Sequence, residues 1–150
     1  MVNLEIIDRA EIPAEWLQTF KQYASVADNG RDALLSSMLT LAVLRVQEVA
    51  DRSLLACTIR LTDDEAYYGV RLYQSATEIV SVTDAKGGEP MWSQEGRDIY
   101  TKADAIEVVY KTAPIPSSID SLLPIVYQYA TALYDGQDTK ALASILSQCQ

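Results

Sequence analysis

The sequence has 150 residues, of which 49% are hydrophobic and 22% are charged, as in an ordinary globular domain. The 21 acidic residues outnumber the 12 basic ones, and the formal net charge of −9 excludes a general electrostatic affinity for nucleic acid or anionic lipid. Histidine is absent and the two cysteines, Cys57 and Cys149, lie far apart, which excludes histidine-based catalysis, histidine metal sites and a disulfide scaffold.

Neither a membrane span nor a signal peptide is expected. Polar residues interrupt every long apolar stretch, and the start of the chain lacks the basic residues and apolar run of a signal peptide. We therefore expect a soluble protein, made inside the cell, that folds as one domain over residues 1–150.

The first half of the chain is dominated by predicted helices. Residues 4–8 form either an arm or a strand, and we expect a flexible arm over residues 1–12. Apolar residues at helical spacing predict a helix at 13–25, with Pro13 in its first turn. The strongest pattern, from Asp32 to Arg52, carries an apolar band so wide that it indicates burial against more than one neighbour, one of which can be another subunit.

Beyond residue 53 the apolar period changes from helical to alternating, which predicts strands. The candidate strands are residues 55–61, 67–73, 78–83, 91–93 and 105–111. Asp84 to Gly88 read as the turn that ends the third of them. A helix is expected after Pro116 and up to Tyr134, either kinked at Pro124 or beginning near Leu123. A short final helix, within residues 138–150, has one apolar stripe.

No reactive group of residues emerges from the sequence. Gly87-Gly88 lacks the Lys-Ser/Thr pair of a phosphate loop, and Asp63-Asp64-Glu65 lacks the spacing of a calcium loop. Cys57 reads as a small core residue, and the nine tyrosines are equally compatible with a core and with protein contacts. We expect no enzyme activity, no cofactor and no metal.

Acidic residues concentrate between positions 61 and 100, where there are eight acidic and only three basic residues. They either solvate loops and strand faces or form a surface that a passing polyanion does not stick to. Taken together, the elements predict an α+β fold that is mainly helical, with long helices packed with a small antiparallel sheet or hairpin.

Four pieces of sequence, in order, resemble the small head–tail connector (adaptor) proteins of tailed bacteriophages. They are the long helix ending in Ala50-Asp51-Arg52, the strand and turn from Glu78 to Gly87, the piece with Tyr100 and Ile106-Glu107-Val108-Val109-Tyr110, and Pro116 followed by the helix ending in Ala130-Thr131-Ala132-Leu133-Tyr134. The likeness covers about residues 30 to 135.

This resemblance implies a structural virion protein of the neck, made in the bacterial host cytoplasm. Copies would form a homo-oligomeric ring, of twelve copies in that family, beneath the portal protein. The ring would extend the DNA channel to the tail or stopper protein, with DNA passing through unbound and no membrane involved. An acidic lining and a helix with a wide apolar band suit that role.

Three groups of residues are the expected contact sites. The subunit interface is expected at Leu34, Met38, Leu41 and Arg45. A hairpin that faces the lumen or the tail is expected at Asp84, Lys86, Gly87 and Gly88. Portal docking, which the resemblance assigns to a terminal segment, is expected at Leu142, Ile145 and Leu146, although the same stripe can belong to the subunit's own core.

Two other functions fit the sequence. One is a small non-enzymatic binding module, such as a tail-completion or assembly factor, that works as a monomer or dimer. The other is a carboxylate-based hydrolase or metal enzyme, which would need acids to converge in a pocket. Assembly state separates the ring from the binding module.

Overall fold

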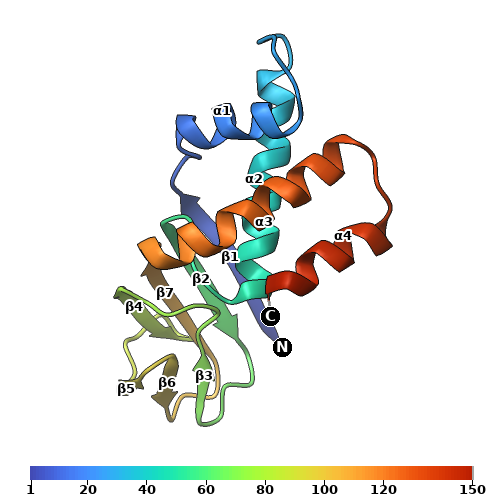
Figure 1. The fold of residues 1–150 in the computed structure, drawn as a ribbon. Coiled ribbons are helices and arrows are strands. Elements are labelled where there is room, and N and C mark those ends of the chain that lie inside the picture. Colours follow the sequence, from blue (N-terminus) through green and yellow to red (C-terminus); the bar gives the residue numbers. More distant parts are fainter. Residues whose placement is uncertain (150) are drawn as a thin grey trace. The chain divides into compact units, whose positions relative to one another are not determined.

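The computed structural model describes residues 1–149, which divide into two compact units. The first unit combines Met1–Ala10 with Leu55–Ala113, and the second combines Glu11–Leu54 with the chain from Pro114 onward. Strands form the first unit and helices form the second (Figure 1).

The larger sheet of the first unit has four strands, all antiparallel to their neighbours. In the order in which they pair, they are β1 (Val2–Arg9), β2 (Cys57–Asp63), β7 (Ile106–Thr112) and β4 (Glu78–Asp84). Buried and partly exposed residues alternate along β2 and β7, as expected for strands with one covered face. Ile59, Leu61 and Val108 lie on that covered face.

A second sheet of three short strands completes this unit. It contains β3 (Gly69–Arg71), β6 (Asp98–Thr101) and β5 (Trp92–Glu95), in that order. Gly69 must be a glycine, because its φ is +145° and a Cβ there would lie 2.2 Å from the carbonyl oxygen of Ile99. The close approach brings β3 directly against β6.

Tyr110 of β7 joins the larger sheet to the segment that follows β3. Its hydroxyl accepts a hydrogen bond from the backbone N–H of Tyr73 at 3.0 Å. The Arg97 guanidinium, from the β5–β6 turn, donates to the carbonyl oxygen of Leu72 at 2.9 Å and also to that of Tyr73. Burial raises the pKa of the Tyr110 phenol, which stays neutral at physiological pH.

Four helices and a terminal 3₁₀ turn form the second unit. They are α1 (Ala14–Tyr23), α2 (Asp32–Ala50), α3 (Pro116–Tyr134), α4 (Thr139–Leu146) and η1 (Ser147–Cys149). Helix α3 packs against α1, α2 and α4 (Figure 1). Its Pro124 lies inside a single helix rather than before a new one. Phe20, Leu39 and Val126, all fully buried, represent the core that these helices share.

Two polar contacts fix the ends of α2. The Lys21 ammonium group is buried and donates to Asp32 at 2.9 Å and to Asn29 at 2.7 Å, which ties α1 to the start of α2. At the other end Asp51 adopts a left-handed conformation with φ of 56°, and the Gln47 side chain accepts from the N–H of Leu54 at 2.9 Å. The helix therefore ends at Ala50, with Asp51 as its C-cap residue.

The expected mainly helical fold, with long helices on a small sheet, is wrong. Helices hold 40% of the chain and strands hold 27%, so the structure is α+β with two antiparallel sheets. The strand content was underestimated because the sequence allows either an arm or a strand at residues 4–8 and does not predict β6, whereas β5 is expected at residues 91–93. Strand β6 pairs with β5 across a tight turn and also with β3, about 30 residues earlier in the chain, and local propensity does not encode that second pairing.

We predict that Tyr110→Phe lowers the free energy of unfolding by about 1–3 kcal/mol, because the N–H of Tyr73 loses its acceptor while the ring volume is kept. Tyr100→Phe is the matched control, since Tyr100 is an exposed tyrosine on β6 of the same unit and should change stability by less than about 0.5 kcal/mol. Urea denaturation measures both values. Equal effects of the two substitutions would contradict the assigned role of Tyr110.

Candidate interaction surfaces

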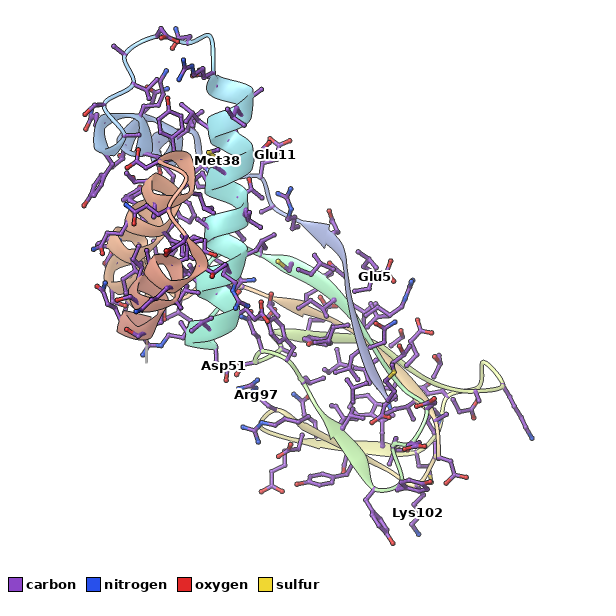
Figure 2. All side chains as sticks on the ribbon, turned by 90° about the vertical axis from the view of Figure 1, so that its right-hand side faces the viewer. Glu5, Glu11, Met38, Asp51, Arg97 and Lys102 are labelled. Carbon is purple, nitrogen blue, oxygen red and sulfur yellow. The ribbon has the colours of Figure 1, made fainter. Side chains whose placement is uncertain are left out.

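An apolar stripe on α2 points away from the core of the helical unit. Leu34 and Leu41 are 51% and 56% exposed, Met38 is half-buried, and Arg45 is exposed and paired with Glu48 at 3.1 Å. Spacings of four, three and four residues place these side chains on one helix face. The structure therefore brings the four predicted interface residues together; Met38 is labelled in Figure 2.

The same helix is long and apolar enough to cross a membrane by length and composition alone, with a mean hydropathy of 1.4. No other helix of residues 1–149 meets that test. The test is weak evidence for a span, because α2 also supplies Leu35, Leu39 and Val43 to the core of its unit. Much of its apolar character is explained by that core.

The residues after β4 form an ordered turn built around Asp84 rather than the expected hairpin, because β4 pairs with β7 and the next strand, β5, belongs to the other sheet. The carboxylate of Asp84 accepts from the N–H groups of Lys86 at 2.9 Å and Gly88 at 3.0 Å, and Gly87 has φ of +79°. Asp84 is thus engaged in the turn, while Lys86, Gly87 and Gly88 are exposed. Of the four predicted residues, these three are therefore the ones most accessible to solvent.

The apolar stripe of α4 lies partly within its own unit. Leu146 is only 8% exposed and Cys149 is buried as well, whereas Leu142 and Ile145 are half-exposed. The side chain of Asp138 caps the helix by accepting from the N–H of Ala141 at 2.9 Å. Of the three predicted docking residues, Leu142 and Ile145 are therefore the accessible ones.

The sequence did not reveal a wide cleft of about 760 Å³ on the small sheet. Its lining includes Tyr68, Met91, Trp92, Tyr100 and Lys102, and Lys102 projects from the far end of the sheet (Figure 2). Tyr68 is 86% exposed and Met91 is 94% exposed. Aromatic residues and methionine in this density are typical of protein contacts. The adjacent tyrosines at 67 and 68 were the one signal, because the other residues come from separate segments.

Metal and thiol chemistry have little support in the described residues. Between residues 1 and 149 no group of three cysteine, aspartate or glutamate side chains could hold a metal ion. Both cysteines are free and buried, and burial raises the pKa of the Cys149 thiol. A smaller fraction of that thiol is ionised at neutral pH, which lowers its reactivity.

No protein-family model and no curated protein matches the sequence. The fold, in contrast, is shared with chains of solved structures. A chain in the neck of an empty gene transfer agent (GTA) particle, computed with C6 symmetry, has a TM-score of 0.68 at 14% identity, and the alignment covers 99% of this chain and 95% of that one. The folds correspond from end to end.

Two further chains show the same similarity. One belongs to the virion of a native GTA particle, with a TM-score of 0.66 at 13% identity over 98% of this chain and 94% of that chain. The other belongs to the neck of a native GTA particle computed with C12 symmetry, with a TM-score of 0.56 at 14% identity over 96% and 95%. At such identities the likeness concerns the fold.

We predict that Leu146→Ala lowers the free energy of unfolding by about 2 kcal/mol or more, because it removes a buried side chain. Leu142→Ala, on the same helix but half-exposed, should cost clearly less. Urea denaturation of the two variants compares them directly. A larger loss for Leu142→Ala would show that the two positions have been assigned the wrong way round.

Proposed function

We propose that this protein is a structural component of the neck of a phage-like virion, where copies of it form a ring. The observation that carries the proposal is the end-to-end likeness to chains of GTA particles and their necks, which covers at least 96% of this chain and 94% of those chains. A likeness of that extent means that the shared fold includes both units of the chain.

Within the neck, we assign the chain to the connector or adaptor ring beneath the portal, which extends the DNA channel to the tail. The four sequence pieces that resemble phage connectors support this finer assignment. Twelve copies fit the C12 symmetry with which one similar neck was computed. The protein acts without a cofactor or a catalytic site, and its partners are further copies, the portal and the tail or stopper protein.

Each surface has a place in this assignment. The α2 stripe of Leu34, Met38, Leu41 and Arg45 contacts a neighbouring subunit, because exposed leucines on a helix gain most from a repeated contact. The turn at residues 84–88 faces the lumen or the tail. The half-exposed side chains of Leu142 and Ile145 on α4 face the portal.

The net charge of −9 governs how DNA moves through such a ring. Binding to DNA draws on the release of counterions when lysines and arginines neutralise phosphates, and an acidic lining offers few such contacts. DNA therefore passes through the channel without being retained.

We predict that Leu41→Glu abolishes ring formation and leaves the subunit folded, since Leu41 is more than half exposed. Ala33→Glu is the matched control: Ala33 is exposed on the same helix but lies about 100° around it from Leu34. Native mass spectrometry and electron microscopy count the copies, and circular dichroism checks the fold. Normal rings with Leu41→Glu would remove the stripe from the interface, and a wild-type protein that stays monomeric even with its portal would favour a binding module.

We predict that replacing Glu65, Glu89 and Glu95 by lysine makes rings retain duplex DNA in a salt-sensitive way. All three are exposed, and the exchange changes the net charge from −9 to −9 + 6 = −3.

The control variant carries lysine at the exposed positions Glu11, Asp120 and Asp135 of the helical unit, with the same net charge. Filter binding at increasing salt compares the two. Equal retention by both would show that total charge matters and that the 61–100 segment has no special position.

A further inference from the structure

The larger sheet ends in two open edges. No strand pairs with the outer side of β1 or of β4 in the part of the chain that the structure describes. All eight residues of β1 are exposed, and Leu4 and Ile6 among them are large and apolar. A long apolar edge strand of this kind is a template for pairing with another chain.

Two rows of directly opposed residues cross all four strands and contain only apolar or aromatic side chains. The rows are Leu4, Leu61, Val108 and Val82, and Ile6, Ile59, Tyr110 and Ile79. The members on β2 and β7 are buried, as is Val82 at the β4 edge, but Leu4 is 45% exposed. On the covered face, the side chain of Val82 is therefore protected from solvent at the β4 edge, whereas that of Leu4 is exposed at the β1 edge.

The strand directions allow these two edges to meet. Every pair in the order β1-β2-β7-β4 is antiparallel, so β1 and β4 run in opposite directions. A second copy placed with its β1 beside β4, and with the same face covered, continues the antiparallel alternation without a break. The copies are then related head to tail, which is the contact that generates a ring.

The backbone hydrogen-bonding pattern at both edges is also compatible with this pairing. The N–H of Ala10 donates to the carbonyl oxygen of Ala56 at 2.8 Å, so the backbone N–H and C=O groups of every second residue after Ala56 point toward β1. Two of these residues, Arg60 and Thr62, are paired with Glu5 and Asn3, whose backbone groups therefore point toward β2. The backbone groups of Leu4 therefore point outward.

On the other edge, the N–H of Thr77 donates to Lys111 at 2.8 Å. The backbone groups of Lys111 and of every second residue of β7 then point toward β4. The backbone groups of Ser81 and Thr83 therefore point toward β7, and those of Val82 point away from the sheet. Leu4 and Val82 lie in the same row, and each has a free donor and acceptor aimed away from the sheet.

We propose that β1 of one copy pairs with β4 of the next copy, with Leu4 opposite Val82, so that the sheets of neighbouring subunits join. This rests on the ring of the proposed function. The acids near these edges do not stand bare against each other, because Glu5 is paired with Arg60 at 3.1 Å and Glu78 with Lys111 at 3.7 Å.

Irregularities in both strands limit the pairing to a short stretch. The register of β1 shifts between Ile6 and Asp8, and that of β4 shifts between Ile79 and Ser81. Bulges at edges restrain uncontrolled growth of a sheet. The N–H of Asp84 already donates to the carbonyl oxygen of Gly88 at 2.8 Å, so the regular segments left to form the contact are residues 2–6 and 81–83.

The test is a pair of cysteines at Asn3 and Thr83, which this register places directly opposite each other across the contact. In a pair without mutual backbone hydrogen bonds the Cα atoms lie about 4.5 Å apart, within the range of a disulfide. Within one subunit the same positions are three strand spacings apart, about 14 Å, so a bond can form only between copies. The two natural cysteines are buried.

We expect Asn3→Cys/Thr83→Cys to give a ladder of covalent oligomers on non-reducing gels after mild oxidation. The control pair Asn3→Cys/Ser81→Cys is displaced by two residues and should cross-link at least tenfold more slowly. Dimers from Asn3→Cys alone would show that two β1 strands pair with each other and would overturn the proposal.

Leu4→Pro tests the backbone contact separately, because its N–H is not used by β2 and proline is tolerated on an edge. It should weaken association at least tenfold more than Leu4→Ala, with an unchanged circular dichroism spectrum.

Rings that form without cross-links overturn the strand pairing and leave the neck function standing. Cross-linked open chains without rings support the pairing and count against the ring. Monomers with no cross-link at any concentration overturn the pairing.

Discussion

The stability of the sheet unit depends on one tyrosine, which belongs to the larger sheet and also holds the segment that follows β3. The ring of Tyr110 belongs to an apolar row of the four-stranded sheet, and its hydroxyl accepts the N–H of Tyr73 from the segment after β3. Arg97 holds the carbonyl groups of the same segment. Because these partners come from three separate strands or turns, the small sheet, its aromatic cleft and the covered face of the larger sheet all rely on that position.

The long-range part of the fold was less accessible from sequence than the local part. The pattern at 32–52 predicted α2, observed at Asp32–Ala50, and the pattern at 105–111 predicted β7, observed at Ile106–Thr112. Both have many apolar residues at one clear period. Strand β6 has few and was not expected; besides its neighbour β5 it pairs with β3, about 30 residues earlier in the chain.

The candidate surfaces also divide into those made by one element, which the sequence revealed, and those assembled from separate segments, which it did not. Leu34 and Leu41 were identified because one helix carries them, and spacing along a helix determines which residues share a face. The aromatic cleft collects Tyr68, Met91 and Tyr100 from three segments, so only the folded chain brings them together. The acidic segment gave an ambiguous signal for a further reason: Asp63 and Asp84 bind backbone N–H groups in turns and are not free surface charge.

The division of the chain between the two units has a consequence for how the protein is made. The backbone passes from one unit to the other three times, after residues 10, 54 and 113. Strand β1 must wait for β2, about 50 residues later in the chain, and α2 must wait for α3. Contacts between residues so distant in sequence slow folding, because the intervening loops must close first. Neither unit is complete until most of the chain has been synthesised, so nascent subunits cannot join a growing assembly before they are nearly full length.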